Sequence, residues 1–227
     1  KGLFGYTPED GKCLIYSDYS QLELRCIATI TNEGNMANLY RRGEDLHDYT
    51  ANMLFGENWT KNDRQIAKTC NFNLLYGGSA AILCQILLKQ TGIKLPEAQA
   101  NVYKNMWKRL WPSVVAWQQR GINDWRNGQL GSTPFGRQYI GNLMTDQLNI
   151  ENQGFGAEVA KLAMHYMYPR LKELSEEVLL CDFIHDSYII ECPLEPVLYE
   201  AASTIVAHSM QEAWFEAIKS TKIPTLP

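Results

Sequence analysis

The chain has 227 residues, of which 45% are hydrophobic and 20% are charged, a composition typical of a soluble globular protein with one or two interlocked subdomains. Its longest apolar runs, such as AAILCQILL, are too short to cross a bilayer, so we expect no membrane-spanning segment. A formal net charge of −4 excludes a generally basic surface, so any contact with nucleic acid must come from a local cluster of Lys and Arg or from another chain.

The first residues and the cysteines bear on the compartment. The opening KGLFGYTPEDG has neither an initiator Met nor the basic start and apolar run of a signal peptide, so we expect no such peptide and a chain that is a segment or a processed product. The six cysteines include no CxxC pair, which favours reduced, mostly packed thiols in a cytosol-like compartment over a zinc site.

The first half of the chain is predicted to contain one strand followed by helices. Residues 12–17 form a short apolar run suited to a strand, and a helical spacing of apolar residues begins at Leu22, with Asp18 at the change between them. Further helices are predicted at about 45–55, 62–76 and 79–90. A long helix at about 96–127 must be kinked or divided by Pro112.

The second half is predicted to hold most of the sheet. GQLGSTPFGRQYIG, at 128–141, is rich in turn residues and typical of a hairpin, and residues 151–174 return to a helical pattern. EVLLCDFIHDSYIIEC then predicts two apolar strands joined by a tight turn at His185 and Asp186, before a last helix at about 194–219. The organisation is therefore mainly helical around a small antiparallel sheet.

Two aspartates are candidate metal ligands. Asp18 ends the first predicted strand and Asp186 lies at the tip of the predicted hairpin, so their carboxylates could face each other across neighbouring strands. Such charges repel unless cations lie between them, and Mg²⁺ suits carboxylate oxygens accompanied by substrate phosphates. Two ions would activate an attacking oxygen and stabilise a leaving oxygen in an in-line phosphoryl displacement. The alternatives are structural roles, a turn residue for Asp186 and a helix N-cap for Asp18.

A stripe of two cations and two rings follows in RQIAKTCNFNLLYGG, at 64–78. Arg64, Lys68, Phe72 and Tyr76 are spaced by four residues, which on an α-helix places them in one stripe about 18 Å long. The cations could hold the triphosphate of a nucleotide whose base and sugar lie against the rings. The alternative is a half-buried helix whose rings pack in the core and whose cations are solvated.

Three segments resemble motifs A, B and C of family-A DNA polymerases, in the same order and spacing: DYSQLELR at 18–25, RQIAKTCNFNLLYGG at 64–78 and IHDS at 184–187. Secondary family features have counterparts in GEDLHDYTANMLFG at 43–56, TPFGRQYI at 133–140 and NIENQGFGAEVAKLAM at 149–164. The resemblance covers nearly the whole chain. It implies an α+β fold, with a polymerase palm containing a small antiparallel sheet (1–42 and 128–227) and mainly helical fingers (43–127) that include the nucleotide-binding helix 62–76.

The resemblance also implies roles for single residues. Asp18, Asp186 and the backbone carbonyl of Tyr19 match the ligands of two Mg²⁺ ions, for which Mn²⁺ can substitute. Arg64 and Lys68 match a triphosphate clamp, and the Lys68 amine is chemically suited to protonate the pyrophosphate leaving group. The other matches are nucleotide-binding Gln21, Glu23 (which excludes a 2′-hydroxyl), His47, Phe72 and Tyr76, and DNA-binding Tyr76, Gly77, Arg137, Asn149, Gln153 and His185.

The chain departs from the family pattern at two positions. Asn73 stands where the family usually has glycine, and Ser187 replaces the acid that commonly follows motif C. We expect altered nucleotide fit near Asn73, and altered metal or primer-end behaviour near Ser187 rather than inactivity. Three further carboxylates receive no role: Glu151, Glu158 and Asp182.

The resemblance begins just upstream of motif A, and the chain ends at IPTLP, short of the last palm strand of the family. The thumb, the first part of the palm and any exonuclease would then belong to a missing segment or a companion chain. We therefore expect one piece of a larger or divided polymerase, with a phage-type enzyme as one candidate since compact members of the family occur in phages. It would work in the cytoplasm of a bacterium or an infected host cell, with an organelle as the alternative.

The predicted function is that of a DNA-templated DNA polymerase core acting on primer–template DNA and dNTPs. A single-subunit RNA polymerase shares the palm plan, but Glu23 with Phe72 favours deoxynucleotides. A metal-dependent nuclease would use paired aspartates but would not need Arg64 and Lys68. A non-catalytic DNA-binding or assembly module descended from a polymerase is the third alternative.

Overall fold

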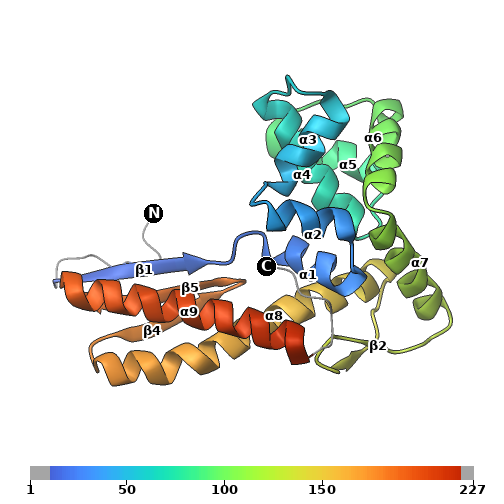
Figure 1. Cartoon of the computed structure of the whole chain (residues 1–227). Coiled ribbons are helices and arrows are strands. Elements are labelled where there is room, and N and C mark those ends of the chain that lie inside the picture. The colour runs from blue at the N-terminus through green and yellow to red at the C-terminus, as the bar shows by residue number, and fades with distance from the viewer. Residues whose placement is uncertain (1–10, 221–227) are drawn as a thin grey trace. The chain divides into compact units, whose positions relative to one another are not determined.

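The computed structural model describes residues 11–220 (Figure 1). Residues 1–10 and the closing IPTLP, on which the expectations about the chain ends rest, lie outside this range. The described chain forms two compact units. The first unit contains residues 11–22 and 155–220, and the second contains residues 23–154. The limits of palm and fingers stay a prediction.

A three-stranded antiparallel sheet organises the first unit. Its strands are β1 (Lys12–Asp18), β4 (Leu179–Ile184) and β5 (Ser187–Pro193), in the order β1-β5-β4. Strand β1 pairs with β5 from Lys12 opposite Pro193 to Asp18 opposite Ser187. The apolar run of residues 188–190 is buried in this central strand. The small antiparallel sheet predicted from the sequence is therefore confirmed.

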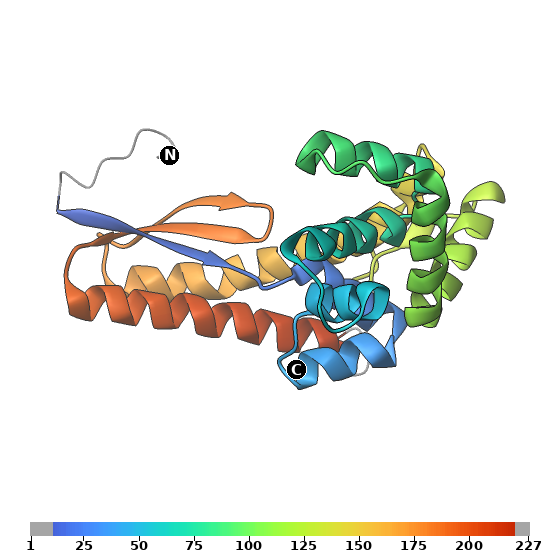
Figure 2. The same cartoon turned by 90° about the horizontal axis from the view of Figure 1, so that it is seen from above.

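Two helices lie side by side along one side of this sheet (Figure 2): the part of α8 (Met144–Leu174) that begins at Phe155, and α9 (Pro196–Ser220). The Tyr188 hydroxyl of β5 donates a 2.8 Å hydrogen bond to the carbonyl of Ala160 on α8. Arg170 of α8 pairs with Glu212 of α9 at 2.7 Å. The buried aromatic and aliphatic residues between helices and sheet form the core of the unit.

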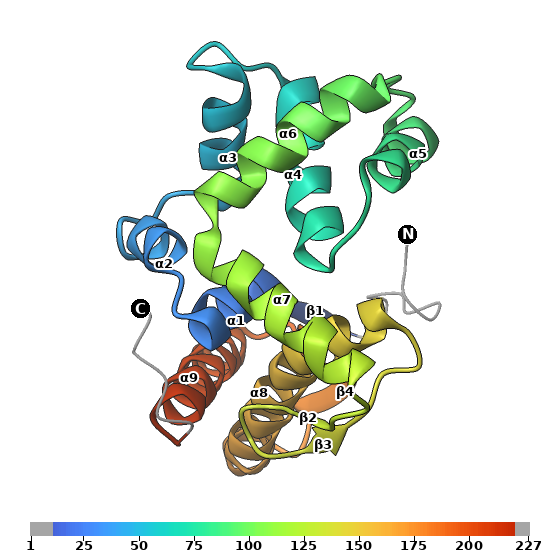
Figure 3. The same cartoon turned by 90° about the vertical axis from the view of Figure 1, so that its right-hand side faces the viewer.

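The second unit is mainly helical. It contains α1 (Leu22–Thr31, from Glu23 on), α2 (Gly34–Arg41), α3 (Leu46–Phe55), α4 (Lys61–Leu75), α5 (Ala80–Thr91), α6 (Glu97–Leu110), α7 (Pro112–Arg126), the short hairpin β2 (Gly131–Ser132) and β3 (Gln138–Tyr139), and the first residues of α8. Helix α4 lies between α3 and α5, and α6 crosses them (Figure 3). The fully buried Leu83, Leu87 and Trp107 belong to the core of this layer.

Helix α4 has well-defined ends. Thr60 and Asp63 form a capping box at its start, in which each side chain accepts a hydrogen bond from the other residue's backbone N–H. At its end, the side-chain amide of Gln118 donates to the carbonyls of Leu74 at 2.6 Å and Leu75 at 2.7 Å. Gly77 then adopts φ +77°, a backbone conformation that favours glycine and turns the chain away from the helix.

The long helix predicted at about 96–127 is divided at Pro112 as expected: α6 ends before Trp111, and Pro112 is the first residue of α7. Two other helices differ from the prediction. Helix α8 begins at Met144, not at 151, and helix α2 was not predicted at all. Within residues 11–220, no helix is both long enough and apolar enough to cross a lipid bilayer.

Candidate active site

Asp18 and Asp186 lie at the same end of adjacent strands in the first unit. Asp18 is the last residue of β1, opposite Ser187, the first residue of β5. Asp186 directly precedes Ser187 in the tight turn that joins β4 to β5, as the sequence predicted. His185 takes φ +58° in this turn, and the carbonyl of Asp186 accepts a 3.3 Å hydrogen bond from the backbone N–H of Tyr19.

The two carboxylates interact. Partial burial and the neighbouring Asp18 carboxylate raise the pKa of Asp186 above its usual range. Ser187 donates a 3.0 Å hydrogen bond from Oγ to Oδ1 of Asp18, and the Tyr16 hydroxyl lies 2.7 Å from the same Oγ. Helix α1 starts four positions after Asp18, at Leu22, so Asp18 is not its N-cap. A cation between the aspartates would relieve their repulsion.

The chemistry of this pair fits a hard divalent cation. Both groups offer carboxylate oxygens, the ligands that Mg²⁺ prefers, and Mg²⁺ commonly takes one or two protein carboxylates with substrate phosphates and water. No set of three or more His, Cys, Asp or Glu side chains in the described part of the chain could hold a metal ion. The aspartates would therefore supply only part of a coordination sphere. Tyr19, whose hydroxyl donates to the carbonyl of Met210 at 2.8 Å, and Gln21, which takes φ +55°, lie just beyond β1.

A cavity of about 710 Å³ runs along α4 in the second unit. The residues that line it come from α1, α4, α5 and α8 and the loop after α4. They include six of the predicted site residues: Glu23, Lys68, Phe72, Tyr76, Asn149 and Gln153. Ile82 and Ile86 of α5 add apolar lining that was not predicted. Lys68 is exposed and forms no hydrogen bond or ion pair with any described residue.

Tyr76 and Glu23 are joined within the cavity. The Tyr76 hydroxyl donates to Oε1 of Glu23 and accepts a 2.9 Å hydrogen bond from the side-chain amide of Asn152. Burial and the Glu23 carboxylate raise the pKa of Tyr76, so it stays a neutral donor. Asn152 was not predicted, because only its contact with a residue far away in sequence gives it a role.

The loop after α4 is tightly packed. A Cβ at Gly78 would clash with the Asn73 side-chain amide, so a larger residue there would require Asn73 to move. Asn73, the residue that departs from the family pattern, also lines the cavity, and its buried Oδ1 has no hydrogen-bond partner among the described residues. Asn73 therefore takes part in the packing at the end of the stripe.

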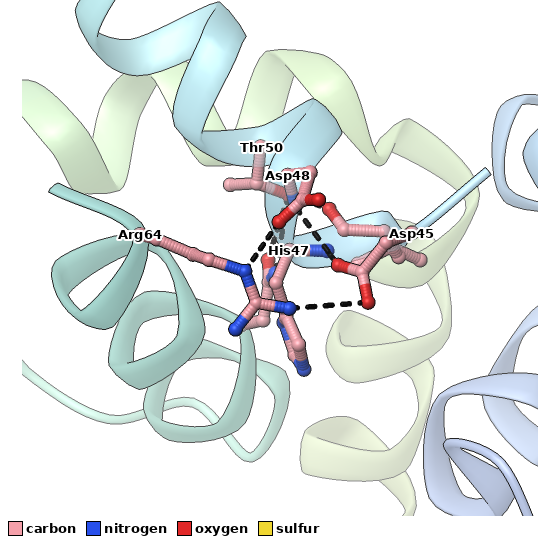
Figure 4. Close-up of polar contacts among 7 residues, drawn as sticks. Asp45, His47, Asp48, Thr50 and Arg64 are labelled. Carbon is pink, nitrogen blue, oxygen red and sulfur yellow. Dashed lines mark hydrogen bonds and ion pairs between the residues drawn. The ribbon is translucent and has the colours of Figure 1, made fainter. Parts of the chain in front are cut away.

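Arg64 does not line this cavity, although it lies on α4 with Lys68 and Phe72. Its guanidinium pairs with Asp48 through Nε and with Asp45 through Nη2 at 3.2 Å (Figure 4). Asp45 is also the N-cap of α3, accepting hydrogen bonds from the backbone N–H groups of His47 at 2.8 Å and Asp48 at 2.9 Å. Neither acid was predicted as a partner of Arg64, whose charge is already balanced by them.

His47 lies close to the predicted stripe. Its ring is buried, and its centroid lies 5.5 Å from that of Phe72. Burial is the main cause that lowers the pKa of His47 to about 4, with Arg64 and Lys68 adding to the effect and Asp45 and Asp48 opposing it. The side chain is therefore neutral near pH 7.

The remaining predicted residues lie outside the cavity lining. Arg137 is exposed, and Gly154 gives its guanidinium room on α8, since a Cβ there would lie 2.5 Å from Nη2. Glu151, one of the unassigned acids, accepts a 3.0 Å hydrogen bond from Nε1 of Trp117, and burial raises its pKa. Asp182 is another of the unassigned acids, and its Oδ1 accepts a 2.7 Å hydrogen bond from the backbone N–H of Phe183.

Comparisons with known proteins agree with the motif resemblance. The family model described as DNA polymerase family A matches residues 4–225. DNA polymerase I of Aquifex aeolicus is 31% identical over 218 residues, 94% of this chain and 37% of that protein. The thermostable DNA polymerase I of Thermus filiformis is 34% identical over 224 residues, 92% of this chain and 26% of that protein.

A solved structure has a similar fold. It is described as the POL domain of Pol1 from M. smegmatis in complex with DNA primer-template and dNTP, and it matches 90% of this chain and 38% of its own with a TM-score of 0.78 and 23% identity. The α+β fold class is thus confirmed. The chain spans only about a quarter to two fifths of the length of these proteins. Because the family model matches almost the whole sequence, the chain belongs to DNA polymerase family A.

Proposed function

We propose that the chain is the catalytic core of a DNA-templated DNA polymerase, which adds dNTPs to the 3′ end of a primer, and that it is one piece of a larger or divided polymerase. The observation that carries the proposal is the pair of interacting carboxylates, Asp18 and Asp186, at the ends of adjacent strands in a chain of this family. Paired carboxylates of this kind suit phosphoryl transfer assisted by two divalent ions.

In the proposed reaction, the primer 3′-oxygen attacks the α-phosphorus of the nucleotide, the bond to the bridging oxygen of the β-phosphate breaks, and pyrophosphate leaves. Asp18 and Asp186, with the carbonyl of Tyr19, would hold two Mg²⁺ ions, or Mn²⁺ in their place. When bound, these ions neutralise the phosphates and lower the pKa of the attacking hydroxyl. Lys68, exposed and without an ion pair among the described residues, would bind the triphosphate and give a proton to the pyrophosphate.

Arg64 would complete the triphosphate clamp after exchanging its present acids for phosphate oxygens. The cavity along α4 offers apolar and aromatic lining for a base and sugar, with Glu23 positioned against a ribose 2′-hydroxyl. Gln21 and His47 would also contact the nucleotide. The proposed DNA contacts are Tyr76, Gly77, Arg137, Asn149, Gln153 and His185.

The proposed partners are primer–template DNA, dNTPs and the segment or companion chain that carries the thumb and any exonuclease. The similar solved structure is of a protein in complex with primer–template and dNTP, and the relatives are longer than this chain. Since those relatives are bacterial, the proposed place of action is the cytoplasm. In the terms used for the family, residues 43–127 would be the fingers and the rest the palm.

Extension of a labelled primer on a short template, with Mg²⁺ and dNTPs, tests the proposal. The assay compares the chain alone and the complete assembly with the variants Asp186→Asn and Asp182→Asn. Asp182 is a matched control, because it lies in the same hairpin but bonds to its own neighbour. We expect extension that Asp186→Asn abolishes and Asp182→Asn leaves intact. Lack of extension by the folded, DNA-bound assembly would favour a non-catalytic binding module instead.

A further inference from the structure

A buried hydrogen-bond network connects three helices of the second unit behind Phe72. At its centre is Asn71 on α4, only 1% exposed. Its side chain lies within hydrogen-bond distance of His47 and Thr50 on α3 and of Trp107 on α6. Buried polar groups of this kind fix one another's orientation when every donor and acceptor is satisfied.

The orientation of the Asn71 amide follows from its neighbours. Nε1 of Trp107 lies 2.9 Å from Oδ1 of Asn71, and an indole N–H can only donate, so an oxygen must face it. On the other side, the Thr50 hydroxyl donates at 2.8 Å to the carbonyl of Leu46, and its oxygen lies 3.1 Å from Nδ2 and 3.3 Å from Oδ1 of Asn71. The Trp107 contact selects the amide orientation, and the Thr50 oxygen can accept from Nδ2 in that orientation.

This orientation determines the tautomer of His47. Nδ2 of Asn71 lies 3.0 Å from Nδ1 of His47, and an amide nitrogen can only donate. Nδ1 must therefore accept, and the single proton of the neutral ring lies on Nε2. Protonation of both nitrogens would set an N–H against the amide N–H. No described residue forms a hydrogen bond with Nε2.

The charges around His47 are those of the predicted triphosphate clamp. Arg64 and Lys68 of α4 disfavour a third positive charge, whereas Asp45 and Asp48 at the start of α3 favour it. His47 is only 4% exposed and packs against Phe72, and burial dominates the balance. Figure 4 shows His47 with Arg64 and these two acids.

We propose that Asn71 and Trp107 are positioning residues that hold His47 as a neutral imidazole, with its Nε2–H available to donate to the phosphates of the nucleotide. The phosphate as acceptor rests on the proposed function, whereas the tautomer does not. A fixed neutral donor adds a directional hydrogen bond to the charges of Arg64 and Lys68 without adding to their mutual repulsion.

Long-range ¹H–¹⁵N correlation spectra of the ¹⁵N-labelled chain at pH 7 test the tautomer directly. The chain has four histidines, so the His47→Gln variant assigns the His47 signals and the exposed His165 and His208 serve as internal references. We expect protonated Nε2 and unprotonated Nδ1 in the wild type. A protonated Nδ1, alone or with Nε2, would overturn the proposal.

Two variants test the positioning. Asn71→Asp replaces the donor with a carboxylate oxygen, so Nδ1 of His47 should become protonated. Trp107→Phe removes the N–H that orients the Asn71 amide, so a mixture of His47 tautomers should appear. This variant also tests the positioning if Asn71→Asp does not fold. Asn101→Asp is the matched control, since this exposed amide donates to the Glu97 carbonyl on α6, away from the network. An unchanged Nε2–H tautomer in the folded variants would contradict the role of Asn71 and Trp107.

Titration with inorganic tripolyphosphate tests the acceptor. We expect the Nε2 signal of His47 to shift saturably in the wild type, and affinity to fall roughly tenfold or more in His47→Gln, as for loss of a hydrogen bond to a charged group. If the Nε2 signal of His47 does not shift when tripolyphosphate binds, the donor role of His47 is wrong. These spectra do not depend on catalysis, so failure of primer extension alone would refute the proposed function and leave the tautomer of His47 and the positioning roles of Asn71 and Trp107 standing.

Discussion

The buried neutral His47 predicts how the stability of the fold depends on pH. Its pKa is lowered to about 4 in the folded chain, mainly by burial, against an ordinary value of 6.5. In the unfolded chain, His47 is therefore protonated as the pH falls below about 6.5. In the folded chain, it is protonated only near pH 4. Stability contributed by the neutral ring is present above pH 6.5 and is lost as the pH falls between these values.

The magnitude follows from the pKa difference of about 2.5, which at 1.36 kcal/mol for each pKa unit corresponds to a loss of about 3 kcal/mol. His47→Gln removes the titrating group. The free energy of unfolding of the wild type relative to this variant should therefore fall by about that amount from pH 7 to pH 4.

Urea unfolding at several pH values, followed by circular dichroism, measures this difference. His208→Gln, at an exposed histidine of α9, provides the baseline for replacing a histidine. A difference between the wild type and His47→Gln that stays constant from pH 7 to pH 4 would show that the pKa of His47 is not lowered by folding. It would show that His47 titrates in the folded chain much as it does in the unfolded one.

Three further variants have specific expected outcomes. Gln118→Met removes the side-chain donor to the last two carbonyls of α4. Because the Leu74 carbonyl still accepts from the backbone N–H groups of Tyr76 and Gly77, the free energy of unfolding should fall by about 1–3 kcal/mol in urea titrations; a loss near zero would show that water replaces the amide. Asp48→Asn weakens a half-exposed partner of Arg64 and should tighten dNTP binding by roughly two- to fivefold, measured as KM or Kd; weaker binding would contradict competition between acid and phosphate. Glu23→Ala should relax sugar selection, so that primer extension with ribonucleotides rises relative to dNTPs; continued rejection of ribonucleotides would show that another residue excludes the 2′-hydroxyl.

Local sequence patterns were sufficient for the framework of the fold. The apolar runs on either side of His185 and Asp186 predicted the hairpin correctly, because two short apolar runs separated by a two-residue turn leave few other arrangements. Pro112 divided the long helix as expected, since proline fits the first turn of a helix and not its interior. Helix α2 was missed because its short segment contains Gly and two Asn, which are poor helix formers, and because its cap, Glu33, is not a common N-cap residue.

The site was predictable where one element carries it. Lys68, Phe72 and Tyr76 line one cavity because their spacing follows the helix period, and Tyr76 lies just past the end of α4. The partners of these residues were not predictable. Asn152 meets Tyr76 across 76 positions of sequence, and Trp107 meets Asn71 across 36, so only the packing of helices reveals them.

The acids beside Arg64 were missed for a related reason. Asp48 lies 16 positions before Arg64, on a different helix. From sequence alone, an acid in the first turn of α3 is expected to be solvated and to need no partner. Ser187 was noticed as a departure, but its hydrogen bond to Asp18 depends on the register between β1 and β5. Register and helix packing are properties of the whole fold, which a local pattern does not encode.

Nucleotide addition by a DNA polymerase should depend on the template base, and this dependence can be measured. Four primer–templates that differ only in the first unpaired template base are each offered one dNTP at a time, with Mg²⁺ and the complete assembly, and Asp186→Asn is run beside the wild type. We expect addition of the complementary dNTP alone on each template, with release of pyrophosphate and no addition by the variant. Addition regardless of the template base, or equal addition by Asp186→Asn, would rule out templated synthesis by this site.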